Sequence, residues 1–290
     1  MSPSSYLTGL IGAGIGPSLS PALHEREAVR HGVPLLYRTL DLDLLGTPPE
    51  QVGELLRAAR QLGFDGLNIT HPCKQLVLEH LDELAPEAAE LGAVNTVVLR
   101  DGRAVGHNTD VTGFAKAFAR GLPDAPTGHV VQLGAGGAGA AVAHALLNLG
   151  VDRLTLCDTD PARAAALADA LTARFGAGRA APGTPADVTT ADGLVHATPT
   201  GMAAHPGLPL PAELLRPALW VAEVVYRPLR TQLLDTADRL GCRTLDGGGM
   251  AVFQAADAFR LFTGLEPHTD AMLADFAELA ETPALGGRRG

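Results

Sequence analysis

The sequence predicts an α/β protein built of two domains. Short apolar runs rich in β-branched residues alternate with segments of helical period along most of the chain. The turn-rich stretch PDAPTG at 123–128 divides a less regular first part from a more regular second part. Near the start of the second part, a glycine-rich segment joins a strand directly to a helix. We therefore expect a mostly parallel sheet with helices on both faces in the second part.

The first part alternates strands with helices and includes a hairpin-like pair of strands. The expected strands are Tyr6–Ile11, Leu36–Leu40, Gly66–Ile69, Ala93–Leu99 and Ala104–Asn108. The expected helices are Pro21–His31, Pro49–Leu62, Cys73–Leu81, Pro86–Leu91 and Val111–Arg120. This alternation is typical of an α/β domain.

The second part repeats a strand and a helix at regular spacing. Its expected strands are His129–Leu133, Arg153–Cys157, Leu194–Ala197 and Trp220–Val225. One expected helix follows the first of these strands and ends at Leu149. Two further helices are expected over Pro161–Arg174 and Gln232–Leu240. Residues 250–280 follow three glycines and have helical period, and the tail ALGGRRG is expected to fray.

Composition excludes several classes of protein. A chain of 290 residues with 46% hydrophobic and 19% charged residues is neither disordered nor too short to bury a core. The net charge of −10 argues against broad binding to nucleic acid or an anionic membrane. The apolar run at 6–16 is too short to span a bilayer and follows no basic segment. We expect a cytoplasmic protein, and the sequence leaves the oligomeric state open, a homodimer included.

Cysteine and histidine spacing predicts neither a disulfide framework nor a metal site. The three cysteines form no CxxC pair, and the ten histidines form no HExxH pattern. Lysine and asparagine are scarce: the chain has only Lys74 and Lys116, and only Asn68, Asn95, Asn108 and Asn148. Such residues are expected mainly where no substitute serves.

The segment GAGGAG at 134–139 predicts a dinucleotide site. It follows an apolar strand and opens a helix, whose free N–H groups and positive dipole end suit phosphates. Gly134 would allow the tight turn, Gly136 the close approach of a pyrophosphate, and Gly139 the packing of helix on strand. A second glycine segment, GAGIG at 12–16, is followed at once by Pro17 and is expected only to turn the chain or curl around a small ligand.

The acidic residue after the next strand bears on the choice between NAD and NADP. Asp158 ends the strand RLTLCD, where a carboxylate can accept hydrogen bonds from ribose hydroxyls and would repel the 2′-phosphate of NADP. This favours NAD. The nearby Arg163 could instead accommodate a phosphate or lie along the adenine, so NADP stays open.

Polar residues around three strand ends suggest a lined cleft. Ser18 and Ser20 precede a helix, where Ser20 could cap the helix or both hydroxyls could hold a small carboxylate. Asn68, Thr70 and Lys74 surround a strand-to-helix corner, and a lysine there suits proton transfer because its pKa shifts readily. Asn95 lies on a further strand, and Asp110 either caps the next helix or faces the same cleft.

These motifs together resemble the shikimate dehydrogenase family over nearly the whole chain. The matching segments, in order, are SLSP at 18–21, NITHPCK at 68–74, AVNT at 93–96, NTD at 108–110, GAGGAG at 134–139, ATPTGM at 197–202, VVYRPLRTQLL at 224–234 and GGGMAVFQA at 247–255. The resemblance implies a substrate-binding catalytic domain at 1–122, a Rossmann-like NAD-binding domain at 123–246, and helices at 247–290 that return to the first domain.

The resemblance also implies roles for individual residues. Lys74 and Asp110 would be the catalytic pair. The substrate, shikimate or quinate, would be bound by these two together with Ser18, Ser20, Thr70, Asn95, Tyr226 and Gln254. The cofactor would be bound by Gly134, Gly136, Gly137, Ala138, Gly139, Asp158, Arg163, Pro199, Thr200, Gly201, Met202, Val224 and Gly247. The implied reaction is hydride transfer between NAD and a ring hydroxyl, in aromatic amino-acid biosynthesis through the shikimate pathway or in quinate catabolism.

Three departures from the family pattern qualify this interpretation. The family's basic Asn-Arg-Thr pattern for NADP is CDTD here, which is similar to the NAD-preferring quinate/shikimate branch. The asparagine expected before ATP is His196, and the aspartate expected near VVY is Glu223. The alternatives are an NADP-dependent biosynthetic shikimate dehydrogenase, a relative acting on an amino-substituted ring, and a non-catalytic dinucleotide sensor, against which the presence of Lys74 and Asp110 argues.

Overall fold

The structure, a computed structural model, describes residues 5–281, so the tail expected to fray lies outside the described residues. The chain divides into two compact units. The first contains the chain up to Thr109 and again from Val252 onward, and the second contains Asp110–Ala251. The α/β class expected from the sequence is confirmed in both units.

The first unit contains a mixed six-stranded sheet in the order β2-β1-β3-β5-β6-β4. The strands β1, β2 and β3 are parallel to one another, whereas β5 runs antiparallel to both β3 and β6. The bounds are β1 Tyr6–Gly12, β2 Leu35–Asp41, β3 Gly66–Ile69, β4 Glu83–Leu84, β5 Thr96–Arg100 and β6 Arg103–His107. The hairpin of β5 and β6 is confirmed, and its first strand starts at Thr96, three residues later than expected.

Helix packing against this sheet is illustrated by α3, which buries an apolar stripe along one of its faces. In α3 the buried residues Val52, Leu56 and Ala59 recur at helical spacing and join Leu67 and Ile69 of β3 in one core. Burial of each valine, leucine or isoleucine side chain in this core contributes about 1.5–3 kcal/mol. The helices are α1 Ser20–Arg30, α2 Leu42–Leu45, α3 Val52–Gln61, α4 Cys73–Leu76, α5 Pro86–Leu91, α10 Gly248–Thr263 and α11 Thr269–Glu281.

The second unit contains a six-stranded sheet in which every strand pair is parallel. Its order is β12-β11-β10-β7-β8-β9, so the winding direction reverses between β7 and β10. The strands are β7 His129–Leu133, β8 Arg153–Cys157, β9 Ala180–Pro182, β10 Gly193–His196, β11 Trp220–Glu223 and β12 Arg243–Leu245. Ligands of such sheets bind outside the carboxyl ends of the strands at the reversal, so this edge is where a cofactor is expected.

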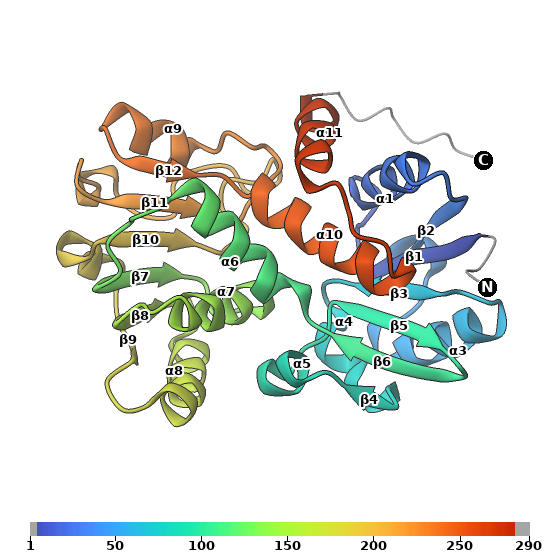
Figure 1. Cartoon of the computed structure of the whole chain (residues 1–290). Coiled ribbons are helices and arrows are strands. Elements are labelled where there is room, and N and C mark those ends of the chain that lie inside the picture. Colours follow the sequence, from blue (N-terminus) through green and yellow to red (C-terminus); the bar gives the residue numbers. More distant parts are fainter. Residues whose placement is uncertain (1–4, 282–290) are drawn as a thin grey trace. The chain divides into compact units, whose positions relative to one another are not determined.

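The first helix of the second unit leads into the sheet, and the helices after each of β7, β8 and β11 connect successive parallel strands. Figure 1 shows α6 crossing in front of the sheet, with α7 below it. The bounds are α6 Thr109–Gly121, α7 Gly137–Asn148, α8 Pro161–Phe175 and α9 Gln232–Arg239. The core includes Val131, Leu194 and Val221, one from each of three neighbouring strands.

Several predicted elements differ in detail from the structure. The helix expected over Cys73–Leu81 is α4 followed by a separate 3-10 turn, Leu78–His80. The helical region 250–280 is two helices, because Gly264 adopts φ +74° and ends α10. The short strands β4, β9 and β12 were not expected, since two or three residues carry no periodic pattern.

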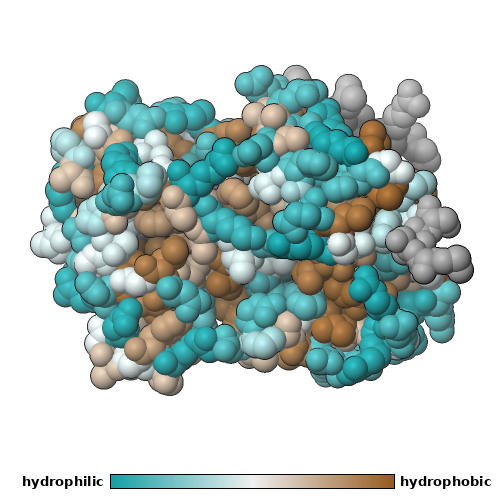
Figure 2. Space-filling view, in the orientation of Figure 1, coloured by the Kyte–Doolittle hydropathy of each residue, from teal (hydrophilic) through white to brown (hydrophobic). Residues whose placement is uncertain are grey.

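Figure 2 shows hydrophilic residues over much of the displayed face, with hydrophobic areas between them. Among the described residues, no helix is long and apolar enough to cross a membrane.

Candidate functional site

The glycines of 134–139 occupy the positions that a nucleotide-binding loop requires. Gly134 has φ +103°, which side chains other than glycine rarely adopt. A Cβ on Gly139 would lie 2.2 Å from the carbonyl oxygen of Gly134, so only glycine lets α7 begin this close to β7. By contrast, a Cβ on Gly136 or Gly137 would meet no atom within 4 Å. This open side, with Ala138 half-buried beside it, leaves the start of α7 free to receive a phosphate.

A buried glutamine fixes this loop, which the sequence analysis did not anticipate. Gln132 is fully buried in β7, and its side-chain Nε2 donates to the carbonyl oxygens of Gly134 at 2.9 Å and Gly139 at 2.8 Å. The signal in the sequence was a polar residue inside the otherwise apolar strand HVVQL. Gln132 thereby holds both ends of the glycine loop in place.

Asp158 follows the neighbouring strand β8 and is bound to the same loop. Its carboxylate accepts the N–H groups of Ala135 at 2.8 Å and Asp160 at 2.9 Å. Burial by itself would raise the pKa of Asp158, but these two N–H groups and the charge of Arg163 outweigh burial and hold the pKa below its usual value. A negative charge therefore lies beside the loop at neutral pH. Arg163 is exposed and forms an ion pair with Asp160 at 3.4 Å.

Two further segments begin at the same edge of the second sheet. ATPTGM at 197–202 follows β10, and VVY at 224–226 follows β11. Gly201 has φ +95°, and a Cβ on Gly247 would lie 2.5 Å from the carbonyl oxygen of Val224. The expected cofactor residues of 197–202, Val224 and Gly247 therefore lie at the carboxyl ends of strands next to the glycine loop. Burial raises the pKa of Tyr226 in this segment.

In the first unit, Asn95 is the centre of a buried polar network. Its Oδ1 accepts the hydroxyl of Thr96 at 2.9 Å and the N–H of Thr109 at 2.8 Å. Its Nδ2 donates to the Thr109 hydroxyl at 3.0 Å and to Oε1 of Gln254 at 3.2 Å. Asn68 joins through Thr96 Oγ1 at 3.0 Å. The structure thus brings together the predicted residues Asn95 and Gln254, which are 159 positions apart.

Thr70 and Lys74 occupy the corner that the sequence predicted. Thr70 directly follows β3, and its N–H donates to the carbonyl oxygen of Ile11 at 2.9 Å. Lys74 lies half-buried in α4, and its carbonyl oxygen accepts the N–H of Val94 at 2.9 Å. These backbone bonds tie the corner to β1 and to the strand segment leading to Asn95.

Ser18 and Ser20 are both half-buried, and their hydroxyl oxygens lie 3.2 Å apart. The prediction that Ser20 caps the helix is wrong, because α1 begins at Ser20 and Leu19 precedes it as the cap residue. Instead, Oγ of Ser18 accepts the N–H of Ser20 at 3.2 Å. The capping alternative for Asp110 is also wrong, because α6 already begins at Thr109.

The predicted site residues are divided between the two units. Ser18, Ser20, Thr70, Lys74, Asn95 and Gln254 belong to the first unit, whereas Asp110, Tyr226 and all expected cofactor residues belong to the second. Asp110 is buried and lies in the first turn of α6, the helix whose start marks the division between the units.

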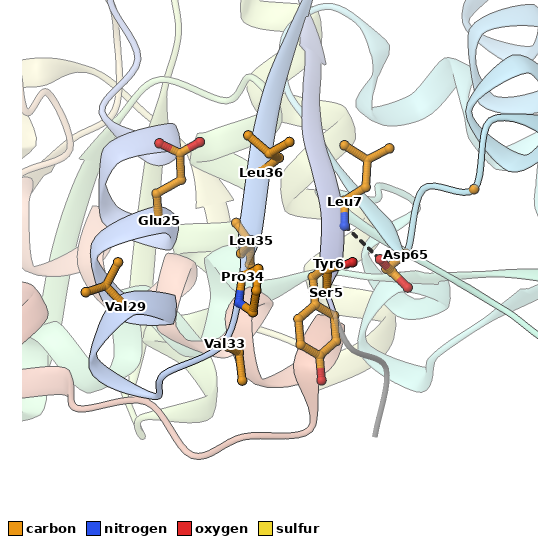
Figure 3. A pocket seen from close by; sticks show the side chains of 11 residues that line it. Ser5, Tyr6, Leu7, Glu25, Val29, Val33, Pro34, Leu35, Leu36 and Asp65 are labelled. Atoms are coloured by element: carbon orange, nitrogen blue, oxygen red, sulfur yellow. Dashed lines mark hydrogen bonds between the residues drawn. The ribbon is translucent and has the colours of Figure 1, made fainter. Parts of the chain in front are cut away.

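A hollow of about 600 Å³ in the first unit is lined by none of these residues. Figure 3 shows its lining, including Tyr6, Leu7 and Leu35, with Asp65 accepting the N–H of Leu7 at 2.8 Å. Tyr6, Leu7 and Leu35 lie at the amino ends of β1 and β2, whereas the first unit's predicted residues Ser18, Ser20, Thr70 and Lys74 follow the carboxyl ends of β1 and β3. The hollow is thus separate from the candidate site.

One cluster of the first unit has the composition of a metal site. Side-chain atoms of Glu27, His31 and His268 lie within 4.8 Å of one another. However, the buried Glu27 carboxylate already accepts the N–H of His268 at 2.7 Å, both imidazoles at 2.9 and 3.1 Å, and Arg30 at 2.7 Å. We interpret the cluster as a structural tie between α1 and α11. The absence of a metal site stays a prediction.

Comparison with known proteins identifies the family. The chain is 72% identical to the shikimate dehydrogenase (NADP(+)) of Streptomyces avermitilis over 98% of this chain and 99% of that protein. The chain belongs to the shikimate dehydrogenase family. Residues 10–97 also match the family description "Shikimate dehydrogenase substrate binding domain". The resemblance predicted from the eight sequence motifs is therefore confirmed.

Other members of the shikimate dehydrogenase family differ in the named cofactor. The quinate/shikimate dehydrogenase (NAD(+)) of Corynebacterium efficiens is 53% identical over 96% of this chain and 100% of that protein. The solved structure of quinate dehydrogenase from Corynebacterium glutamicum in complex with NAD has a TM-score of 0.90 at 48% identity, covering 94% of this chain and 99% of that one. The expected oxidoreductase class with an NAD(P) dinucleotide cofactor is confirmed.

Proposed function

We propose that this chain catalyses reversible hydride transfer between NAD and the ring hydroxyl of shikimate or quinate, giving 3-dehydroshikimate or 3-dehydroquinate. The observation that carries this proposal is identity of 72% to a shikimate dehydrogenase across 98% of the chain. The second unit supports it with a glycine loop whose outer side is open and whose inner side only glycine fits. The first unit supports it with hydroxyl, amide and ammonium groups around two strand ends.

The nucleotide, when bound, supplies the hydride acceptor or donor. The chain's own residues supply orientation and a path for the proton. During oxidation Lys74, in its neutral form, takes the proton of the substrate hydroxyl at Nζ, and during reduction it returns the proton. The negative charge of Asp110, the second member of the proposed pair, favours the protonated lysine that results. This pair therefore keeps charge from building up on the substrate oxygen.

The remaining substrate residues fix the ring. The hydroxyls of Ser18 and Ser20, with oxygens 3.2 Å apart, are spaced to donate to the two oxygens of one carboxylate. Thr70, Asn95, Tyr226 and Gln254 hold the ring hydroxyls. Because Asn95 donates to Oε1 of Gln254, the amide of Gln254 is held in a fixed orientation. Such preorganisation lowers the entropy that substrate binding costs.

We propose NAD as the preferred nucleotide because of Asp158. Its lowered pKa keeps the carboxylate charged, and that charge beside the adenosine end would repel a 2′-phosphate while accepting ribose hydroxyls. The competing function is an NADP-dependent shikimate dehydrogenase, which the name of the Streptomyces avermitilis relative favours. Arg163 is exposed, follows Asp158 by five residues and would have to leave Asp160 to bind such a phosphate.

The deciding experiment compares shikimate and quinate oxidation with NAD and with NADP at equal concentration. We expect turnover with NAD to exceed turnover with NADP. Asp158→Asn keeps an acceptor for the N–H of Ala135 but removes the negative charge. The ratio of turnover with NAD to turnover with NADP should therefore fall roughly ten-fold, which corresponds to about 1.4 kcal/mol. Turnover of the wild type mainly with NADP would overturn the cofactor proposal and leave the dehydrogenase proposal standing.

Lys74→Ala tests the proton path. Loss of a positioned acid or base costs about 10²–10⁴-fold in rate, so we expect kcat to fall by that factor while nucleotide affinity is unchanged. Lys116→Ala is the matched control, because Lys116 is the chain's other lysine and is exposed in α6. Near-normal turnover of Lys74→Ala would refute the role of Lys74.

The boundaries of the substrate-binding domain (1–122), the nucleotide-binding domain (123–246) and the C-terminal helices (247–290) stay predictions. The two compact units divide after Thr109 and again after Ala251. We propose that the cytoplasm is where the protein acts, since its substrates and nucleotide are small polar metabolites.

A further inference from the structure

The two unexplained departures from the family pattern, His196 and Glu223, contact each other. His196 is the last residue of β10, Glu223 is the last residue of β11, and the two are paired in the register of the sheet. Both are buried, with 0% and 2% exposure. Nδ1 of His196 lies 2.8 Å and 3.0 Å from the two carboxylate oxygens of Glu223. Because a carboxylate only accepts, Nδ1 carries the proton in this bond.

The pair extends into the segment that follows β10. Nε2 of His196 lies 2.5 Å from the hydroxyl oxygen of Thr198, and this oxygen accepts the N–H of Thr200 at 3.2 Å. His196 therefore reaches residues 198–200, where an asparagine at 196, which ends at the position of Nδ1, would not. This contact exists only because the residue is histidine.

The pair extends equally into the segment that follows β11. Oε1 of Glu223 accepts the N–H of Val225 at 3.0 Å, and Oε2 accepts the hydroxyl of Thr231 at 3.0 Å. Thr231 in turn caps α9 by accepting the N–H of Leu234 at 3.3 Å. Both oxygens of the buried carboxylate are thus satisfied, and such a network rigidifies what it joins.

We infer that His196 and Glu223 form a positioning pair for the nicotinamide half of the dinucleotide. The pair fixes 198–200 and 224–225, the two segments that line the nicotinamide end in the proposed function, on which this inference rests. Neither residue acts on the reacting atoms. The pair instead sets the geometry in which the nicotinamide ring is held, so its loss weakens binding of that half and slows hydride transfer.

The test compares two ligands, one with and one without the nicotinamide ring. Dissociation constants of NAD and ADP-ribose, or of NADP and its 2′-phospho-ADP-ribose if the wild type prefers NADP, are measured by calorimetry without substrate. His196→Asn keeps a donor for Glu223 and loses the contact to Thr198. We expect its affinity for the full dinucleotide to fall about ten-fold, the factor of one hydrogen bond, while ADP-ribose affinity is unchanged.

A second variant and a control keep the test informative if His196→Asn folds poorly. Thr198→Val removes the same hydroxyl from a half-buried position and should give the same selective loss, with no further loss when combined with His196→Asn. The control is His129→Asn, since His129 is a buried histidine bonded to Thr155 at 2.9 Å at the amino end of β7. This control should leave both affinities unchanged.

The outcomes separate this inference from the proposed function. A selective loss of dinucleotide affinity, with lower kcat and unchanged KM for shikimate, supports the positioning pair. An equal loss for both ligands, or no loss, overturns it, whether or not shikimate is oxidised. Because the binding ratio is measured without substrate, failure of the wild type to oxidise shikimate or quinate would overturn the proposed function alone.

Discussion

Replacing Gly139 by alanine tests the packing on which the nucleotide loop depends. The added Cβ would lie 2.2 Å from the carbonyl oxygen and 2.9 Å from the carbonyl carbon of Gly134. Both are backbone atoms, so neither can turn aside as a flexible side chain would. Relief requires α7 to move away from the loop, which strains the bonds that Gln132 donates to Gly134 and Gly139.

The magnitude follows from three effects. Overpacking of this kind costs about 1–3 kcal/mol. Each of the two Gln132 bonds is worth about 1 kcal/mol net, and both are weakened when the loop shifts. Alanine gains at most about 1 kcal/mol over glycine in a helix. We therefore expect Gly139→Ala to lower the free energy of unfolding of the second unit by about 2–4 kcal/mol.

Urea unfolding followed by tryptophan fluorescence measures this change. Trp220 is the chain's single tryptophan, lies in β11 of the same unit and is 1% exposed, so its emission reports unfolding of that unit. The matched control is Gly137→Ala in the same first turn of α7, where a Cβ meets nothing within 4 Å. The control should unfold within about 1 kcal/mol of wild type. A stability of Gly139→Ala within about 0.5 kcal/mol of wild type would refute the packing argument.

Two further predictions concern ionisable groups. Burial favours protonated Glu27, but the N–H groups of His268 and the guanidinium of Arg30 outweigh burial and lower the pKa of Glu27. A pKa lowered on folding stabilises the fold above the ordinary carboxyl pKa, and this contribution is lost as pH falls through the folded pKa. The Glu27→Gln variant should thus be about 1–3 kcal/mol less stable than wild type at neutral pH, but it should lose less stability than wild type on acidification. Thermal unfolding at several pH values measures both differences. Equal loss of stability in acid would contradict the role of the Glu27 carboxylate. Burial also raises the pKa of all three cysteine thiols, those of Cys73, Cys157 and Cys242, and that of Cys157 rises to about 11. A thiol reagent should therefore label the native protein roughly ten-fold more slowly than the urea-unfolded protein. Equal labelling rates would contradict the burial of these thiols.

Elements whose character is local were predictable from the sequence. The strands Gly66–Ile69, His129–Leu133 and Arg153–Cys157 agree to the residue, because each is a short apolar run bounded by turn residues. The roles of the glycines at 134 and 139 were also predictable, since a positive φ and a close backbone approach leave no alternative residue.

Helix starts were less predictable, even though capping is a local property. The sequence SLSP favours Ser20 as the cap, yet α1 takes Ser20 into its first turn and Ser18 accepts its N–H. Several residues near a helix start can satisfy the same free N–H groups, so the spacing of hydroxyls alone does not choose among them.

The sequence by itself determined the α/β class, the nucleotide loop and the family, because periodicity, turn residues and ordered motifs are properties of neighbouring positions. Only the tertiary structure decided that Asn95 meets Gln254, and that His196 and Glu223, noted separately as departures, form one buried pair. These partners are 159 and 27 positions apart. Their contacts depend on the order of strands in each sheet and on the return of α10 to the first unit, neither of which any local pattern encodes.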